Sequence, residues 1–475
     1  MSDTDSDYSS DEEEIDIHAI CLEGTDQDVD WALSKDRLRM LNTKEEKTGR
    51  MPLHVTAFAG MMDRCVLLIK RGAHVDAKDG IAASPLMLAA ESGYTEVCRM
   101  LLECGANIKM KDNYGWTCLH HAVSQAHINC CIMLIKRGVN LSAEEFKNGK
   151  TALHLCAEQG LDELADALIV RGADMYASGD SIYSKTPLHL ACQVGHHEVA
   201  KVLLNRGADM EAMSGFLDKT PLHLACEKGH IKCVRALVEH GADMGAVGFN
   251  VNGNTPLHLA AQNGHSEVCK YLISKGASMQ TQGMWTVQGT PAHTAVQYGH
   301  LGCIQAFLDS GADMEQKDRN GLTIMHTACH NKKYDIAFAL IDKGANLMAE
   351  ANNGRYPIEF VPFEDSHLKE KLRLAGVRYD LEMERLAKLA AEKIAAEKEA
   401  AKQRQLVAEE EARLAAIRLA QKQQREARFC SLLLAACNVS GELSALTDLS
   451  IEFSDLDINI ELDSTLGAHA ITRAA

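Results

Sequence analysis

One four-residue pattern, Thr-Pro-Leu-His or a close variant, recurs ten times between residues 51 and 359. Its second position falls at residues 52, 85, 118, 152, 187, 221, 256, 291, 324 and 357, so successive copies are 33 to 35 residues apart. Seven of the eight prolines of the chain stand in this column. A second column holds Gly72, Gly105, Gly138, Gly172, Gly207, Gly241, Gly276, Gly311 and Gly344. Such a period indicates a repeat protein, in which each unit stacks on its neighbours.

Each repeat is predicted to contain two short helices. A threonine can cap the first helix, and the proline that follows suits the first helical position, where its missing N–H costs nothing. This pattern predicts a first helix over residues 187–195. A second helix over residues 198–207 is expected to end at Gly207 in a left-handed conformation. A helix pair of this size cannot bury both apolar faces by itself, so the repeats must pack on one another.

These columns resemble those of the ankyrin-repeat family over residues 15–377. The resemblance implies an all-α solenoid of nine full repeats, with a degenerate leading repeat at 15–35 and a shortened closing repeat at 356–376. Each repeat would consist of a helix-turn-helix and a β-hairpin-like finger. The finger tips and the first helices would form a concave face. The sequence departs from the family at Cys118, Ala152 and Ile324, which stand in the proline column.

Most cysteines and histidines recur at fixed positions within the repeat. Most cysteines fall at the start of a second helix or in the small-residue pair of a first helix, where a buried small side chain is expected. The resemblance implies that the histidine of each Thr-Pro-Leu-His hydrogen-bonds backbone between neighbouring fingers. No Cys-x-x-Cys, His-Glu-x-x-His or phosphate-binding loop occurs. The sequence therefore predicts no enzyme, no catalytic residue, no metal site and no cofactor.

Four fingers are longer than the family pattern and carry apolar residues. They span residues 178–186, 213–220, 247–255 and 282–290. Contiguous exposed apolar residues often mark an interface, so these fingers are candidate partner-binding elements. The candidates are Tyr183, Phe216, Phe249, Met284 and Trp285. The alternative is that the fingers pack on one another.

Further candidates come from positions that vary in the family and line its concave face. They are Trp116, Gln193, Lys228, Gln262 and Tyr298. Mixed amide, charged and aromatic side chains suit a protein or peptide partner better than a phosphate backbone. The alternative is that each is simply a solvated surface residue.

The segments outside the array differ in composition. Residues 1–14 form an acidic leader, expected to be disordered, and residues 378–428 are rich in Ala, Glu, Lys and Arg, which predicts a long helix. This helix lacks a continuous heptad pattern, which favours a solvated or weakly self-associating helix over a committed dimer. Residues 429–475 contain a short apolar run and an acidic tail, also expected to be disordered.

The distribution of charged residues and the N-terminal sequence limit the binding partners and the cellular location that we expect. Residues 1–30 hold twelve acidic residues and residues 441–463 hold seven, with no Lys or Arg in either segment, and the net charge of the chain is −17. The rest is nearly neutral, so nucleic acid is not an expected partner. Without a signal-peptide pattern, we expect an intracellular protein of the cytoplasm or the nucleus.

The sequence predicts a protein-binding adaptor or scaffold. The alternative is a membrane- or cytoskeleton-associated adaptor that uses the basic helical tail.

Overall fold

The computed structural model describes residues 15–179, 184–216, 218–248, 253–283, 289–361 and 366–439. Within these ranges the regular structure is helical and contains no strand, and the chain divides into two units between Tyr379 and Asp380. The predicted all-α solenoid is confirmed.

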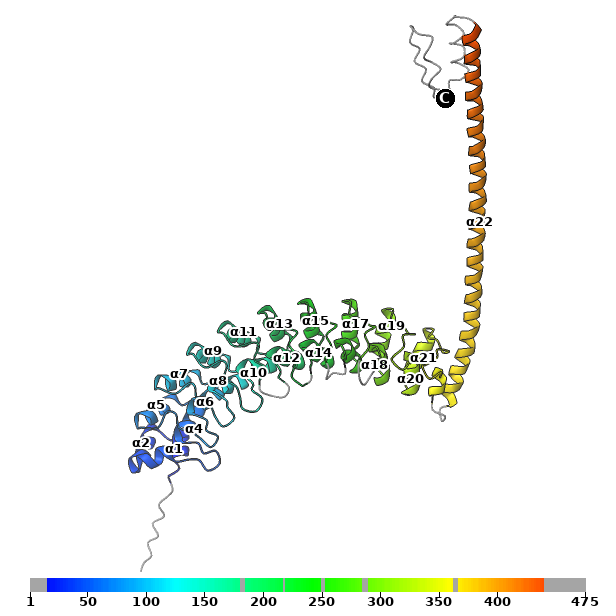
Figure 1. Ribbon diagram of the computed structural model, residues 1–475. Coiled ribbons are helices and arrows are strands. Elements are labelled where there is room, and N and C mark those ends of the chain that lie inside the picture. The colour runs from blue at the N-terminus through cyan, green and yellow to red at the C-terminus, as the bar shows by residue number, and fades with distance from the viewer. Residues whose placement is uncertain are drawn as a thin grey trace, which may run out of the picture. The chain divides into compact units, whose positions relative to one another are not determined.

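Nine helix pairs form the central part of the first unit, within the residues that the structure describes. Figure 1 shows the first helices of the pairs in one row and the second helices in a neighbouring row. The pairs are α4 (Pro52–Phe58) with α5 (Met62–Lys70), α6 (Pro85–Glu91) with α7 (Thr95–Glu103), α8 (Cys118–Ser124) with α9 (Ile128–Lys136), α10 (Ala152–Gln159) with α11 (Asp162–Val170), α12 (Pro187–Val194) with α13 (His197–Asn205), α14 (Pro221–Lys228) with α15 (Ile231–Glu239), α16 (Pro256–Gln262) with α17 (Ser266–Ser274), α18 (Pro291–Tyr298) with α19 (Leu301–Asp309), and α20 (Ile324–His330) with α21 (Tyr334–Asp342).

Shorter elements flank these pairs. The leading repeat consists of α1 (Ile17–Glu23) and α2 (Asp26–Lys35), followed by an additional helix, α3 (Arg37–Asn42). The closing repeat keeps only a 3-10 turn, η2 (Pro357–Phe360), before α22 (Ser366–Val439). The Phe360 ring lies edge-on to His326 at 5.5 Å between centroids, and Leu372 of α22 is buried in the same core. The helix predicted over 378–428 lies within α22, which begins earlier and ends later.

Threonine stands at the N-cap of seven of the nine first helices, and Met51 and Ser84 stand at the N-caps of the other two. The Thr220 hydroxyl accepts a hydrogen bond from the His223 backbone N–H at 3.4 Å, and Pro221 takes the first helical position. Helices α8, α10 and α20 begin at the same register although the proline column holds Cys118, Ala152 and Ile324. Proline is therefore not required at this position for the first helix to begin.

A row of buried histidines joins eight of the nine full repeats to the next finger. The Nδ1 of His223 accepts from the Thr220 backbone N–H at 3.2 Å, so the ring carries its proton on Nε2, which donates to the Asn254 carbonyl at 3.1 Å. Burial lowers the pKa of His223 to about 4. The same ring-to-carbonyl bond is made by His54, His120, His154, His189, His258, His293 and His326.

The cysteines pack as small apolar residues. Of the fourteen cysteines whose side chains the structure describes, thirteen are buried, and Cys104 is exposed. Burial raises the pKa of the Cys65 thiol to about 11, so this thiol stays protonated at neutral pH. No group of three or more His, Cys, Asp or Glu side chains suited to a metal ion occurs among the described residues. Nor is any described helix long and apolar enough to cross a membrane.

The fingers are closed like hairpins but do not reach the regularity of strands. The Asp112 N–H donates to the Trp116 carbonyl at 3.0 Å, and the Oδ1 of Asp112 accepts from the N–H groups of Tyr114 and Trp116. One isolated antiparallel bridge, between Ser214 and Lys219, occurs among the described residues. Asp112 and the backbone bonds between residues 112 and 116 thus shape a tight turn at the end of their finger.

Candidate protein-binding surface

The concave surface is built from the last turns of the first helices and the bases of the fingers. In this surface Gln193 lies in the last turn of α12 and is half-buried, and Lys228 ends α14 and is exposed. The next repeat holds the backbone of these last turns in place, because the Nε2 of His230 hydrogen-bonds the Gln193 carbonyl at 3.2 Å. Three other histidines make the equivalent bond to the preceding repeat, namely His196, His265 and His300.

Lysines at the finger bases reach to these last turns. Lys150 Nζ lies 2.7 Å from Glu158 Oε1, and Lys219 Nζ lies 2.5 Å from Glu227 Oε2. Between them, Lys185 Nζ donates to the amide oxygen of Gln193 at 2.7 Å. A groove of about 190 Å³ is lined by residues of two adjacent repeats, including Lys150, Glu158, Lys185 and Gln193.

The pKa shifts differ between the charged residues at the finger bases and in the last turns of the first helices. Burial opposes ionisation of Glu227, but the hydrogen bonds and positive charges of Lys219 and Lys228 together outweigh it and hold the Glu227 pKa below its usual value. Burial lowers the pKa of Lys185, and the neighbouring Lys219 ammonium lowers it further.

Trp116 lies at the finger base of the repeat that precedes the lysines. Its Nε1 donates to Glu145 Oε2 of the following finger at 2.9 Å, and its ring meets the His121 ring edge-on at 5.3 Å. The side chain is half-buried. Trp116 thus has a structural role between two fingers and still presents part of its ring to the surface.

Gln262 and Tyr298, from neighbouring first helices, contact each other. The Nε2 of Gln262 donates to the Tyr298 hydroxyl at 3.3 Å, and Tyr298 is 45% exposed. The structure therefore brings these two sequence candidates together, Gln262 two repeats and Tyr298 three repeats beyond Gln193.

One long-finger candidate lies within the described residues. Phe216 is 64% exposed at its finger. Tyr183, Phe249, Met284 and Trp285 lie outside the described residues. Packing of the long fingers on one another therefore stays a prediction.

Sequence reasoning missed a row of exposed apolar residues on the shorter fingers. Tyr114 is 60% exposed and Phe146 is 68% exposed, and Ile81 is exposed on the preceding finger. Backbone bonds connect these three fingers, because Asn113 N–H donates to the Ile81 carbonyl and Phe146 N–H donates to the Tyr114 carbonyl, each at 2.9 Å. We call Ile81, Tyr114 and Phe146 the finger-tip row. Aligning the fingers for aromatic content rather than for length could have found it.

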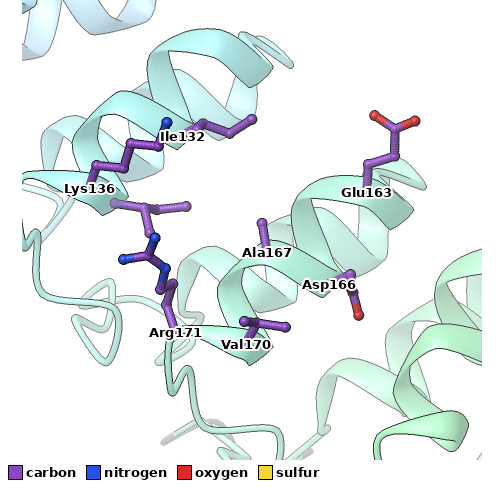
Figure 2. Close-up of a pocket in the computed structure, with 8 residues that line it drawn as sticks. Ile132, Lys136, Glu163, Asp166, Ala167, Val170 and Arg171 are labelled. Carbon is purple, nitrogen blue, oxygen red and sulfur yellow. The ribbon is translucent and has the colours of Figure 1, made fainter.

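A second groove lies on the other row of helices, between α9 and α11. It has a volume of about 270 Å³ and an apolar floor that includes Ile132 and Val170. Val170 is 59% exposed and stands in a column where the other full repeats have polar residues. Figure 2 shows the labelled lining residues Ile132, Lys136, Glu163, Asp166, Ala167, Val170 and Arg171. No sequence candidate lines this groove.

Helix α22 exposes nearly all of its described side chains between residues 391 and 428. The exposed set includes the apolar residues Ile394, Leu406, Val407, Leu414, Ile417 and Leu419. These side chains do not form a continuous stripe. This arrangement fits a solvated helix.

The comparison with protein families agrees with the repeat architecture. The family model described as ankyrin repeats (3 copies) matches residues 17–112, 53–145, 86–179, 143–214, 210–283 and 280–351. A solved structure, the crystal structure of the human ASB11 ankyrin repeat domain, is similar with 27% identity and a TM-score of 0.42. This match covers 48% of the present chain and 98% of the solved one. A search of the curated proteins gave no significant match.

Proposed function

The chain belongs to the ankyrin-repeat family, whose repeats generally mediate protein–protein interactions, and we propose that it is a non-enzymatic adaptor or scaffold. It binds a partner protein through its concave face and its finger tips. The repeat array, residues 15–377, supplies this binding surface. The long helix that follows provides spacing or a second contact.

The finger-tip row is the observation that carries this proposal. The polar groups that recur in most repeats are used inside the array, as in the pair Thr220 and His223. Tyr114 and Phe146, in contrast, expose most of their side chains on adjacent fingers whose backbones are bonded together. Aromatic side chains on a rigid support lose little entropy on binding and are common among the residues that dominate interface energies.

The concave residues extend this surface along the first helices. Gln193, Lys228, Gln262 and Tyr298 lie in the last turns of four successive first helices, and histidines of the following repeats hold the backbone at Gln193 and Gln262. Such preorganised polar side chains can supply specificity around an apolar contact.

We place this function in the cytoplasm or the nucleus. The buried cysteines of the described residues are free thiols, which suits a reducing compartment.

Affinity purification with paired variants tests the proposal. The full chain carrying Tyr114→Ser and Phe146→Ser should lose its specific partner, while its circular dichroism and unfolding midpoint stay close to those of the wild type. Val170→Ser is the matched control, because Val170 is similarly exposed but lies on a second helix. Retention of the partner by the finger variant, or its loss from the Val170 variant alone, would remove the finger tips from the binding surface.

A further inference from the structure

The groove between α9 and α11 is lined by residues unlike those at the same positions of other second helices. Ala167 stands where the three preceding second helices have larger side chains, Leu67, Met100 and Met133. Ile132 stands where the four following second helices have charged ones, Asp166, Lys201, Arg235 and Lys270. Together with Val170, which is 59% exposed, these residues give the groove of about 270 Å³ an apolar lining. This lining is a local feature of the array and not a property of every repeat.

Two cations of this groove lack an ionic contact that joins other neighbouring second helices. In those contacts, a basic residue that directly follows one second helix pairs with the acidic last residue of the preceding second helix. Two such pairs are Arg137 with Glu103 at 2.9 Å and Lys343 with Asp309 at 3.5 Å. At the groove Arg171 follows α11, but the last residue of α9 is Lys136. Two like charges therefore line the same groove, and neither makes an ion pair with a carboxylate of the described residues.

The acidic residues of the groove do not neutralise this pair of cations. Asp166 is held by Arg206 of the next repeat, whose Nε and Nη2 donate to its carboxylate at 2.8 and 3.0 Å. Glu163 lies in the first turn of α11, at the opposite end of that helix from Arg171 (Figure 2). The groove thus has an apolar middle and a positive end. We call Ile132, Ile135, Ala167 and Val170, with Lys136 and Arg171, the α9–α11 groove.

From this arrangement we propose that the α9–α11 groove binds an amphipathic helix of a second partner protein, one with apolar side chains along one face and acidic residues in its first turn. The apolar face of this helix lies on Ile132 and Val170, and its acidic residues lie beside Lys136 and Arg171. The groove is on the second helices, away from the finger tips and the concave face. This inference therefore goes beyond the proposed function, because it gives the chain a second partner on a separate surface.

The positions of the charges set the direction of the bound helix. Helices α9 and α11 are second helices of successive repeats and lie in the same row (Figure 1), with Lys136 and Arg171 at their C-terminal ends. A bound helix that runs antiparallel to them has its N-terminus at this end of the groove. Acidic side chains are favoured in the first turn of a helix, because they compensate its unbonded N–H groups. The same carboxylates neutralise Lys136 and Arg171, whereas a basic first turn meets repulsion from both.

Peptide binding to the full chain tests the inference. The probes are a fluorescently labelled helical peptide with glutamates in its first turn and leucines along one face, and the same peptide with lysines in place of the glutamates. We expect the glutamate peptide to bind, and the lysine peptide to bind at least about tenfold more weakly, because attraction at the positive end becomes repulsion.

Surface variants of the chain separate the apolar contact from the charge contact. Val170→Ser should weaken binding of the glutamate peptide about tenfold, because less apolar surface is buried. Arg171→Glu should weaken the glutamate peptide about fivefold and strengthen the lysine peptide, because it reverses one of the two charges. Lys232→Glu is the control, since Lys232 is an exposed lysine of α15 outside the groove. This control should bind both peptides like the wild type.

Other outcomes overturn the inference. Equal binding of the two peptides, absence of binding to the full chain, or unchanged binding by both Val170→Ser and Arg171→Glu would contradict it. A wild-type chain that is dimeric and becomes monomeric with Val170→Ser would assign the groove to a second copy of the chain. Peptide binding that emerges only after the acidic residues of 441–463 are neutralised would assign it to the chain's own tail. None of these results bears on the finger-tip variants, so the proposed function is tested separately.

Discussion

The imidazole of His230 lies over Gly195, a residue of the preceding repeat. A Cβ atom at Gly195 would come within 2.7 Å of His230 Nδ1, and the backbone there has φ +100°. Gly195 therefore meets two requirements at once, a left-handed helix end and space for the ring that hydrogen-bonds Gln193.

Gly195→Ala should destabilise the array by about 2–4 kcal/mol, because it adds a steric clash with His230 to the backbone strain. Gly207→Ala is the matched control. Gly207 also has positive φ, at +87°, but a Cβ atom there would have nothing within 4 Å. Gly207→Ala should therefore lower the free energy of unfolding by only about 1–2 kcal/mol. Urea unfolding of both variants measures the difference. Equal losses would mean that the His230 contact contributes nothing.

Stability of the array should fall as the pH drops from 6.5 toward 4. Burial holds the pKa of His120, His189, His223 and His258 near 4 in the folded chain, below the ordinary value of 6.5. In this window the unfolded chain takes up protons that the folded chain does not, so acid favours unfolding by about 2–3 kcal/mol per histidine at pH 4.5.

Replacing one of these histidines checks the cause. Urea unfolding at pH 7 and at pH 4.5 should show a smaller pH dependence for His223→Gln than for the wild type, whatever its stability at pH 7. An unchanged pH dependence would assign the acid sensitivity to other groups.

Asp112 should contribute more to stability than the corresponding aspartates of other fingers. Its Oδ1 accepts two backbone N–H groups, and its Oδ2 lies 3.0 Å from Nε2 of the buried His121. Burial disfavours the carboxylate, but the bonds from His121 and the backbone hold the Asp112 pKa below its usual value.

Asp112→Ala should therefore lower the free energy of unfolding by about 2–4 kcal/mol, because it also removes the carboxylate that His121 contacts. Asp318→Ala is the comparison, because Asp318 accepts the N–H groups of Asn320 and Leu322 in its own finger. The Asp318→Ala variant should lower the free energy of unfolding by about 1–2 kcal/mol. Equal unfolding midpoints for the two would contradict the role assigned to His121.

Thiol reactivity should separate Cys104 from the other described cysteines. Cys104 is exposed, whereas Cys118 is buried and burial raises its pKa to about 12. Brief alkylation of the native chain, followed by peptide mass spectrometry, should modify Cys104 and leave Cys118 unmodified until urea is added. Rapid labelling of Cys118 in the native chain would show that its repeat opens readily.

The sequence was sufficient for most of the array because its signals are local. A cap such as Thr220, a proline at the first helical position and a glycine such as Gly207 each act within one turn of a helix, and their period alone requires stacking. The contact of His230 with the preceding repeat was missed, because the Gly-His pair reads as a simple break between two helices.

The boundaries and the site were less accessible to sequence reasoning. Composition placed the long helix at 378–428, but α22 begins at Ser366 and Leu372 packs into the core of the array. Tyr114 and Phe146 were overlooked because their fingers were not among the lengthened ones. Whether such a ring is exposed depends on the direction of the finger turn, which Asp112 and the backbone bonds between fingers decide.

The most direct test of the central claim is hydrogen–deuterium exchange of the full chain with and without its purified partner. We predict slower exchange at residues 112–116 and 145–150, the fingers that carry Tyr114 and Phe146, and in the last turns of the neighbouring first helices. Protection confined to α9 and α11, around the groove of Figure 2, would place the partner on the second helices and contradict the account.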